Sequence, residues 1–133
     1  MLFRSLTRPE LSVLIAYAKM ALYDDLLASD LPDDAYLADD LVKYFPRPLR
    51  KDYGEAIGRH RLRREIIATS VTNSMINRAG ICFVNDLRER LGVPAPEITR
   101  AYTVARQVFG LRTLWNAIEA LDNKVPEIGR AHV

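Results

Sequence analysis

The side chains that could carry nucleophilic or metal chemistry are few and lie far apart in this chain. The single cysteine, Cys82, lies just past the end of one predicted helix and at the start of the next, and the start of a helix can favour a reactive thiolate. A lone cysteine at a helix junction is more often a small buried side chain, so we expect Cys82 to be buried. The two histidines, His60 and His132, lack the H-E-x-x-H spacing of a zinc-binding helix. We therefore predict no catalytic residue and no metal site in this chain.

Patterns that bind nucleotides or build a serine nucleophile are also missing from the sequence. There is no glycine-rich dinucleotide fingerprint, no P-loop and no G-x-S-x-G nucleophile elbow. We predict that no residue here binds a cofactor, and hence that this chain carries none.

An acidic segment runs from Asp24 to Asp40 and holds seven aspartates with no lysine or arginine, a charge of −7. Six of the seven form adjacent pairs, which could suggest a cation site. A calcium-type site needs a looped array of oxygen ligands at defined spacing, and that array is missing. We therefore expect these carboxylates to form a solvated face, with some of them near helix starts.

A basic segment follows from Arg47 to Arg64, where seven Lys or Arg residues against Asp52 and Glu55 give +5. Such a run resembles a phosphate-binding footprint. The net charge of the chain is only +2, and Arg61, Arg63 and Arg64 are spread around a helix rather than aligned. We expect these arginines to pair with the acidic segment, within the fold or across a subunit contact. A nucleic-acid-binding module that uses residues 47–64 is the alternative, and the modest net charge argues against nucleic acid as a partner.

The stretch from Ile66 to Asn77 carries no charge and has apolar residues on more than one side of a helix. A helix of this kind is normally enclosed by others, so we predict the central helix of a bundle. Thr69, Asn73 and Asn77 form one polar ridge at i, i+4 and i+8. We favour hydrogen bonds between helices along this ridge, and a ligand or partner contact is the alternative. A small-molecule binder would show a pocket along the ridge. The candidate packing or partner contacts are Arg61, Arg64, Thr69, Asn73, Asn77 and Arg78.

Helical periodicity and capping signals divide the chain into six or seven helices. The sequence T-R-P-E at Thr7–Glu10 predicts a capping box with proline in the first turn. Gly80 and Gly92 are placed as C-caps, and Gly110 separates the last two helices. We predict an all-α, single-domain helical bundle over residues 1–126, with a tail at 127–133. The predicted helices are Arg8–Ala28, Asp34–Tyr44, Leu49–Ile57, His60–Ala79, Cys82–Leu91, Pro96–Phe109 and Leu111–Leu121.

The composition agrees with one ordinary globular domain. The chain has 133 residues, of which 49% are hydrophobic and 27% charged. One cysteine excludes an internal disulfide bond. No stretch approaches the 18 to 20 apolar residues that a membrane span needs, so we expect no membrane contact and a cytoplasmic protein.

Several long blocks closely resemble the C-terminal region of the large bacterial NAD-specific glutamate dehydrogenases. They are RPELSVLIAYAKMALYDDLLASDLPDD, YFPRPLR, HRLRREIIATSVTNSMINRAG and AYTVARQVFGLRTLWNAIEALDNKVP, in that order. The resemblance covers about Thr7 to Pro126. It implies a parent enzyme that oxidises glutamate to 2-oxoglutarate and ammonia with NAD.

The resemblance further implies that the dehydrogenase core lies upstream of this region in a parent homo-oligomer. No stretch here matches the motifs of that core, so no catalytic residue can be transferred. We expect a helical accessory domain with a structural, assembly or regulatory role, whose partner is the catalytic core of the parent polypeptide. NAD would then belong to the parent and not to this chain.

Overall fold

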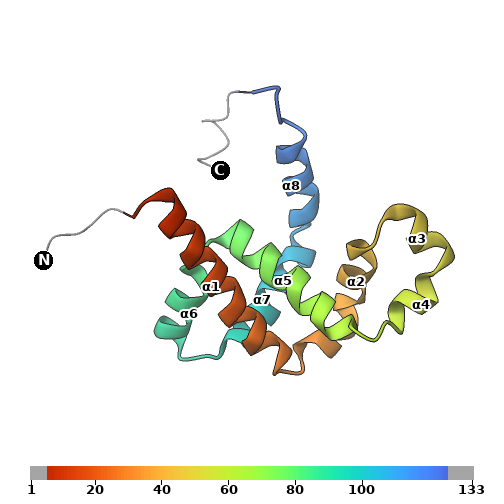
Figure 1. Ribbon diagram of the computed structural model, residues 1–133, viewed down its shortest axis with the longest axis horizontal. Helices are drawn as coiled ribbons and strands as arrows, with labels where there is room; N and C mark the ends of the chain where they lie inside the picture. Colours follow the sequence, from red (N-terminus) through yellow and green to blue (C-terminus); the bar gives the residue numbers. More distant parts are fainter. Residues whose placement is uncertain (1–5, 126–133) are drawn as a thin grey trace, which may run out of the picture. The chain divides into compact units, whose positions relative to one another are not determined.

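The computed structural model describes residues 6–125, which form eight α-helices and two short 3₁₀-helices and contain no strand (Figure 1). The predicted all-α fold is confirmed. The predicted tail, residues 127–133, lies outside the described residues, and the predicted extent of the domain stays a prediction. Contacts along the chain define two compact units, which divide within one helix after Arg100. The two units are described separately below.

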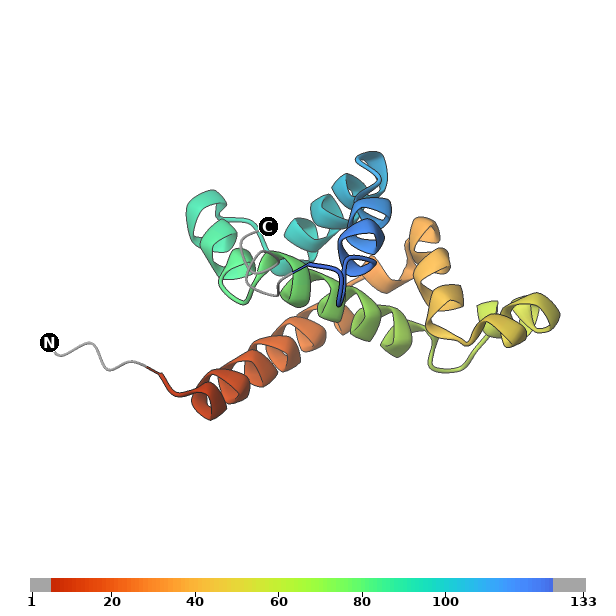
Figure 2. The same cartoon turned by 90° about the horizontal axis from the view of Figure 1, so that it is seen from above.

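The first helix, α1 (Arg8–Leu27), begins as its sequence predicts. The backbone N–H of Thr7 donates to Oε2 of Glu10 at 2.9 Å, and Oγ1 of Thr7 accepts from the backbone N–H of Glu10 at 3.4 Å. These two bonds complete the predicted capping box, with Pro9 in the first turn. Leu22 and Leu26 of this helix are buried, whereas Leu11 and Leu14 are exposed on its N-terminal half. That half extends beyond the crossing with the neighbouring helix (Figure 2).

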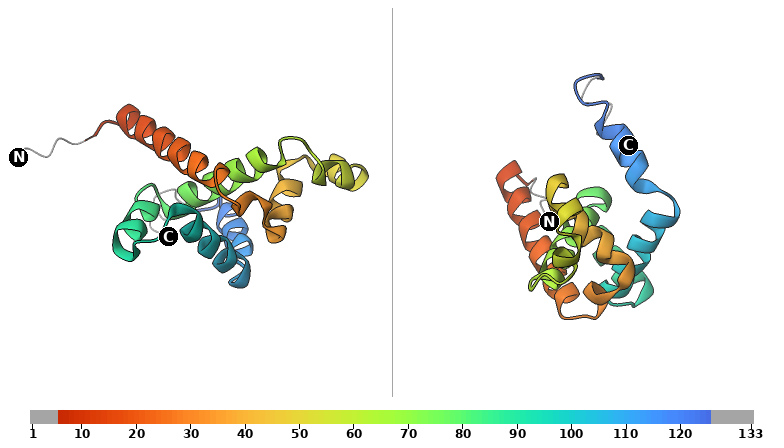
Figure 3. Two further views of the ribbon diagram at one scale, coloured as in Figure 1. Left: turned by 90° about the horizontal axis from the view of Figure 1, so that it is seen from below. Right: turned by 90° about the vertical axis from the view of Figure 1, so that its right-hand side faces the viewer.

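Helix α5 (Arg63–Ala79) is the centre of the first unit, as predicted. It packs against α1, α2 (Ala38–Tyr44) and the 3₁₀-helix η1 (Leu31–Asp33), an arrangement visible in Figures 1 and 3. Two adjacent rows of side chains at i, i+4 spacing face this core. The buried residues of α5 are Ile67, Ala68, Val71, Thr72, Met75 and Ile76.

The predicted start of this helix at His60 is wrong by one turn. The imidazole Nδ1 of His60 accepts from the backbone N–H of Leu62 at 3.1 Å, which holds a turn just before the helix. The helix therefore begins at Arg63, and Arg61 lies in the turn. A histidine side chain that bonds its own backbone competes with the helix in the way that turn-forming polar residues do.

Two more predicted helices are divided in the structure. The region predicted as Asp34–Tyr44 is a 3₁₀-helix, η2 (Ala35–Leu37), followed directly by α2. The region predicted as Leu49–Ile57 contains α3 (Arg47–Asp52) and α4 (Gly54–Gly58), which are separated by Tyr53 outside the helical region at φ −122° and ψ 19°. The described residues therefore contain eight α-helices rather than six or seven.

The remaining helices are close to their predicted bounds. Helix α6 (Phe83–Leu91) ends at Gly92, whose φ of 68° is the left-handed cap expected of glycine. Helix α7 (Ala95–Val108) contains the boundary between the units. In the second unit, Gly110 at φ 58° separates α7 from α8 (Leu111–Glu119), as predicted. Helix α8 has no buried residue.

Candidate functional site

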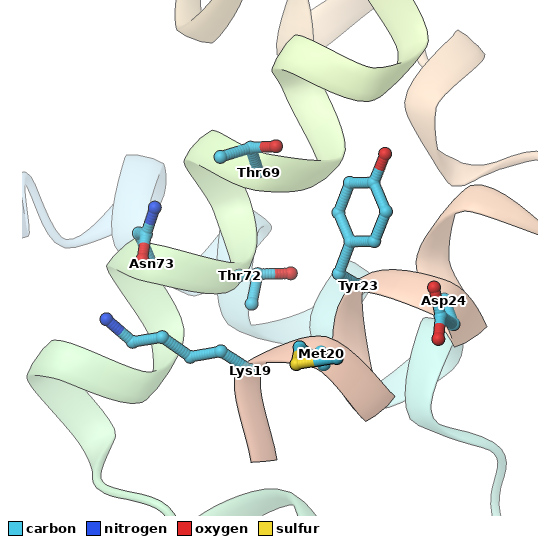
Figure 4. Close-up of a pocket in the computed structure, with 7 residues that line it drawn as sticks. All are labelled: Lys19, Met20, Tyr23, Asp24, Thr69, Thr72 and Asn73. Atoms are coloured by element: carbon cyan, nitrogen blue, oxygen red, sulfur yellow. The ribbon is translucent and has the colours of Figure 1, made fainter. Parts of the chain in front are cut away.

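A groove of about 410 Å³ lies between α1 and α5 in the first unit (Figure 4). One wall comes from the C-terminal half of α1 and the other from the middle of α5. Carbon atoms of Met20 and Tyr23 form much of the first wall, so the groove is suited to an apolar side chain. The lining residues are Lys19, Met20, Tyr23, Asp24, Thr69, Thr72 and Asn73.

The predicted polar ridge borders this groove with two of its three members. Thr69 and Asn73 line the groove, whereas Asn77 is exposed further along α5. Oγ1 of Thr69 donates to the backbone carbonyl of Glu65 at 2.7 Å, within its own helix. Within residues 6–125, neither asparagine side chain forms a hydrogen bond. Residues 6–125 therefore contain no hydrogen bond between helices along this ridge, and the role of the ridge stays a prediction.

Thr72 is the groove residue of α5 that the sequence did not mark as a candidate. It is only 2% exposed, and its Oγ1 is buried without a hydrogen-bond partner in the described structure. A buried hydroxyl without a partner costs about 1–3 kcal/mol. The signal available in the sequence was its spacing, because Thr72 stands between Ala68 and Ile76 on one buried row of α5.

The groove has a positive charge, Lys19, at one end and a negative charge, Asp24, at the other (Figure 4). Neither side chain has an ion-pair partner among residues 6–125. An apolar groove with one cation and one anion at its ends matches a partner with the opposite order of charges.

The predicted contact residue Arg64 does connect segments of the fold. Its Nη2 donates to the backbone carbonyls of Leu27 at 3.0 Å and Ser29 at 2.8 Å, and its Nη1 pairs with Asp33. Because Leu27 is the last residue of α1, the guanidinium bonds carbonyls that the helix leaves without partners. Arg61 is exposed in the turn before α5. Arg78 is exposed in the last turn of α5, where a cation complements the helix dipole.

A second arginine, Arg100, holds a cluster of carboxylates that the sequence analysis did not identify. Its Nε bonds Asp34 at 3.0 Å, its Nη2 bonds Asp30 at 2.8 Å, and its Nη1 bonds Glu97 at 2.7 Å. The hydrogen bonds from Asp34 and then Asp30 raise the pKa of Arg100 above its ordinary value, so the guanidinium stays charged. The hydroxyl of Tyr36 also donates to Asp34, at 3.0 Å.

The acidic segment is therefore less solvated than predicted. Asp40 is only 4% exposed, on the inner side of α2. Asp25 pairs with Arg88 at 3.6 Å and Asp33 with Arg63 at 3.5 Å. The prediction that basic residues neutralise this segment is confirmed for Arg63 and Arg64, but Arg88 and Arg100 come from outside the basic segment.

Several arginines of the basic segment form bonds within the fold. Nε and Nη2 of Arg50 donate to the carbonyls of Phe45 at 2.6 Å and Lys43 at 2.7 Å, at the end of α2. Arg59 pairs with Glu55 at 2.9 Å on an exposed surface. These internal uses, with those of Arg63 and Arg64, reduce the charge available to a phosphate backbone, so the nucleic-acid alternative is not favoured.

The prediction of a buried Cys82 is wrong. The thiol is exposed, because Cys82 is the residue just before α6 and stands at the rim of a second cavity of about 390 Å³. The described residues contain no cluster of three His, Cys, Asp or Glu that could hold a metal ion. No helix within residues 6–125 is long and apolar enough to cross a bilayer.

Comparison with known proteins assigns the chain to a family. Residues 4–132 match the family model described as "Glutamate dehydrogenase, C-terminal". The chain is 47% identical over 123 residues to an NAD-specific glutamate dehydrogenase of Halomonas elongata and 46% identical over 123 residues to that of Pseudomonas aeruginosa. Both matches cover 92% of this chain but only 8% of the relative. An NAD-specific glutamate dehydrogenase of Mycobacterium tuberculosis is 37% identical over 115 residues, which are 86% of this chain and 7% of the relative. The chain therefore belongs to the glutamate dehydrogenase C-terminal family.

Proposed function

We propose that this chain is a helical accessory domain of a larger NAD-dependent glutamate dehydrogenase and has no catalytic centre of its own. The parent would oxidise glutamate to 2-oxoglutarate and ammonia while NAD is reduced to NADH. The domain packs against the catalytic core of the parent polypeptide, where its role is to stabilise the association of the subunits or to regulate the core. The parent would act in the cytoplasm as a homo-oligomer.

The observation that carries the proposal is the small share of the relatives that this chain spans. Nearly the whole of this chain, 92%, aligns with only 8% of the length of relatives named NAD-specific glutamate dehydrogenase. A segment of this size within a large enzyme has most of the polypeptide available as a packing partner. The chemistry of the reaction then resides in the parts of the parent outside these residues.

Exposed apolar side chains on both units support the packing role. On α1 they include Leu11, Leu14 and Tyr17, and on α8 they include Leu114. Contiguous exposed apolar surface commonly marks a contact with another protein surface. In the accessory-domain proposal these side chains are covered in the parent.

Calorimetry of the isolated 133-residue chain tests the absence of a catalytic centre. We expect no heat of binding when NAD is titrated into the chain and no NADH formation with glutamate and NAD. The same titration into the full-length parent is the positive control, and it should show saturable binding. Tight NAD binding by the isolated chain would overturn the proposal.

A further inference from the structure

We infer that the groove between α1 and α5, together with the outward face of α1, is the docking surface for an apolar helix of the parent polypeptide outside these 133 residues. The surface consists of Val13, Tyr17 and Met20 and of the groove residues Lys19, Tyr23, Asp24, Thr69, Thr72 and Asn73. The inference rests on the proposed accessory role and adds to it the docking surface and the chemistry of the partner.

Helix α1 has apolar residues on two opposite sides. Leu22 and Leu26 are buried against the first unit. At 3.6 residues per turn, Val13, Tyr17 and Met20 fall within about 60° of one another and roughly opposite that pair. They are 53%, 64% and 58% exposed. A helix that is apolar on both sides is normally packed against other segments on both. Because the outward side of α1 is exposed in this chain, we expect another segment to cover it.

The outward face of α1 leads directly into the groove. Met20 belongs to both, because it is exposed on the outward face and also lines the groove opposite α5. The spacing of Val13, Tyr17 and Met20 at i, i+4 and i+7 is the pattern by which one helix packs along another. The groove then receives an apolar side chain of the docking helix, in the manner of a knob in a hole.

The charges at the ends of the groove select the charged side chains that the docking helix carries. Lys19 and Asp24 have no ion-pair partner within residues 6–125. A docking helix that presents a carboxylate to Lys19 and a cation to Asp24 complements both charges.

The length of the relatives argues for the parent polypeptide as the occupant rather than a second copy of this region. More than nine-tenths of the relatives lies outside the matched segment, which is 8% of their length. A helix in the same polypeptide is presented to the groove at a high effective concentration. A second copy must instead be brought by subunit association.

Site-specific photo-crosslinking in the full-length parent tests the inference. Tyr17→p-benzoylphenylalanine places the reactive group on the outward face of α1, and mass spectrometry identifies the peptide it captures. We expect a peptide of the parent outside residues 1–133. Met20→Asp in the same background should lower the crosslink yield at least about tenfold, because it buries a charge without a partner. Lys51→Glu is the matched control, since Lys51 is exposed outside the groove, and it should leave the yield unchanged.

A second crosslinker position separates this inference from the proposed function. Leu114→p-benzoylphenylalanine reports from α8, in the other unit. If Leu114 captures a peptide from outside residues 1–133 and Tyr17 does not, the docking inference fails while the accessory role stands. If neither captures such a peptide, both fail. Capture by Tyr17 of residues 1–133 alone, in the same or a second subunit, also overturns the docking inference.

Discussion

The guanidinium of Arg64 donates to the backbone carbonyl of Leu27 at 3.0 Å, from the first turn of α5 to the last residue of α1. A second bond reaches the carbonyl of Ser29 at 2.8 Å, and an ion pair joins the same side chain to Asp33. One side chain thus satisfies carbonyls at a helix end and holds the connection to η1. The packing of α1 on α5, which forms the groove, depends on this junction.

Arg64→Ala is therefore expected to lower the free energy of unfolding by about 2 kcal/mol, because hydrogen bonds to charged groups are worth roughly 1.5–3 kcal/mol. Arg61→Ala is the matched control and should change it by less than about 0.5 kcal/mol, since Arg61 is exposed in a turn. Urea unfolding of the purified chain followed by circular dichroism measures both. Equal losses in the two variants would show that Arg64 does not hold the junction.

Removal of the charge of Arg100 leaves Asp30, Asp34 and Glu97 close together without their shared partner. Arg100→Met should destabilise the chain by about 1–3 kcal/mol, because the arginine is only partly exposed and the carboxylates then repel one another. The loss should shrink between low and high salt, since salt screens that repulsion. Urea midpoints at two ionic strengths test this, and a loss independent of salt would contradict the electrostatic cause.

The buried hydroxyl of Thr72 predicts a substitution that stabilises the fold. Thr72→Val replaces a hydroxyl without a partner by a methyl group of similar size and should raise the free energy of unfolding by about 1 kcal/mol. Thr99→Val is the control with the opposite sign, because Oγ1 of Thr99 donates to the carbonyl of Ala95 at 2.8 Å and lies 3.4 Å from Sδ of Met75. The midpoint of thermal unfolding should rise for Thr72→Val and fall for Thr99→Val. A decrease for Thr72→Val would mean that its hydroxyl has a partner in solution.

Two substitutions of glycine by alanine should change the free energy of unfolding in opposite directions. Gly92 has a φ of 68°, so Gly92→Ala should cost about 1 kcal/mol although no atom lies within 4 Å of the added carbon. Gly58, at the end of α4, has an ordinary φ and equally open space, so Gly58→Ala should stabilise by about 0.4–1 kcal/mol. The difference between their unfolding midpoints is the measurement. If both variants stabilise the chain, the left-handed backbone at Gly92 does not require glycine.

Local signals in the sequence predicted the helix ends well. The Thr7–Glu10 box, the cap at Gly92 and the break at Gly110 each depend on a few neighbouring residues, so they could be read without the fold. The central position of α5 followed from its uncharged, apolar surface. The turn at His60–Leu62 was missed, because it depends on one side-chain bond that helical periodicity does not reveal.

The long-range parts of the site could not be predicted in the same way. The bond from Arg100 to Asp34 joins residues 66 positions apart, and no local pattern pairs one arginine with one of seven aspartates. Leu11, Leu14, Leu22 and Leu26 recur at helical spacing along α1, but periodicity cannot tell which of them another segment covers. Thr69 and Asn73 were identified as a candidate ridge, whereas their partner across the groove, Met20, became visible only from the packing of α1 on α5.

Removal of this region from the full-length parent enzyme tests the central claim most directly. The measurement compares the affinity for NAD, by calorimetry, and the mass of the assembly, by light scattering, in the full-length enzyme and in a variant that lacks these residues. An accessory domain predicts an unchanged affinity for NAD together with a lower thermal midpoint or a smaller assembly. An assembly of unchanged mass and thermal stability that no longer binds NAD would contradict the account.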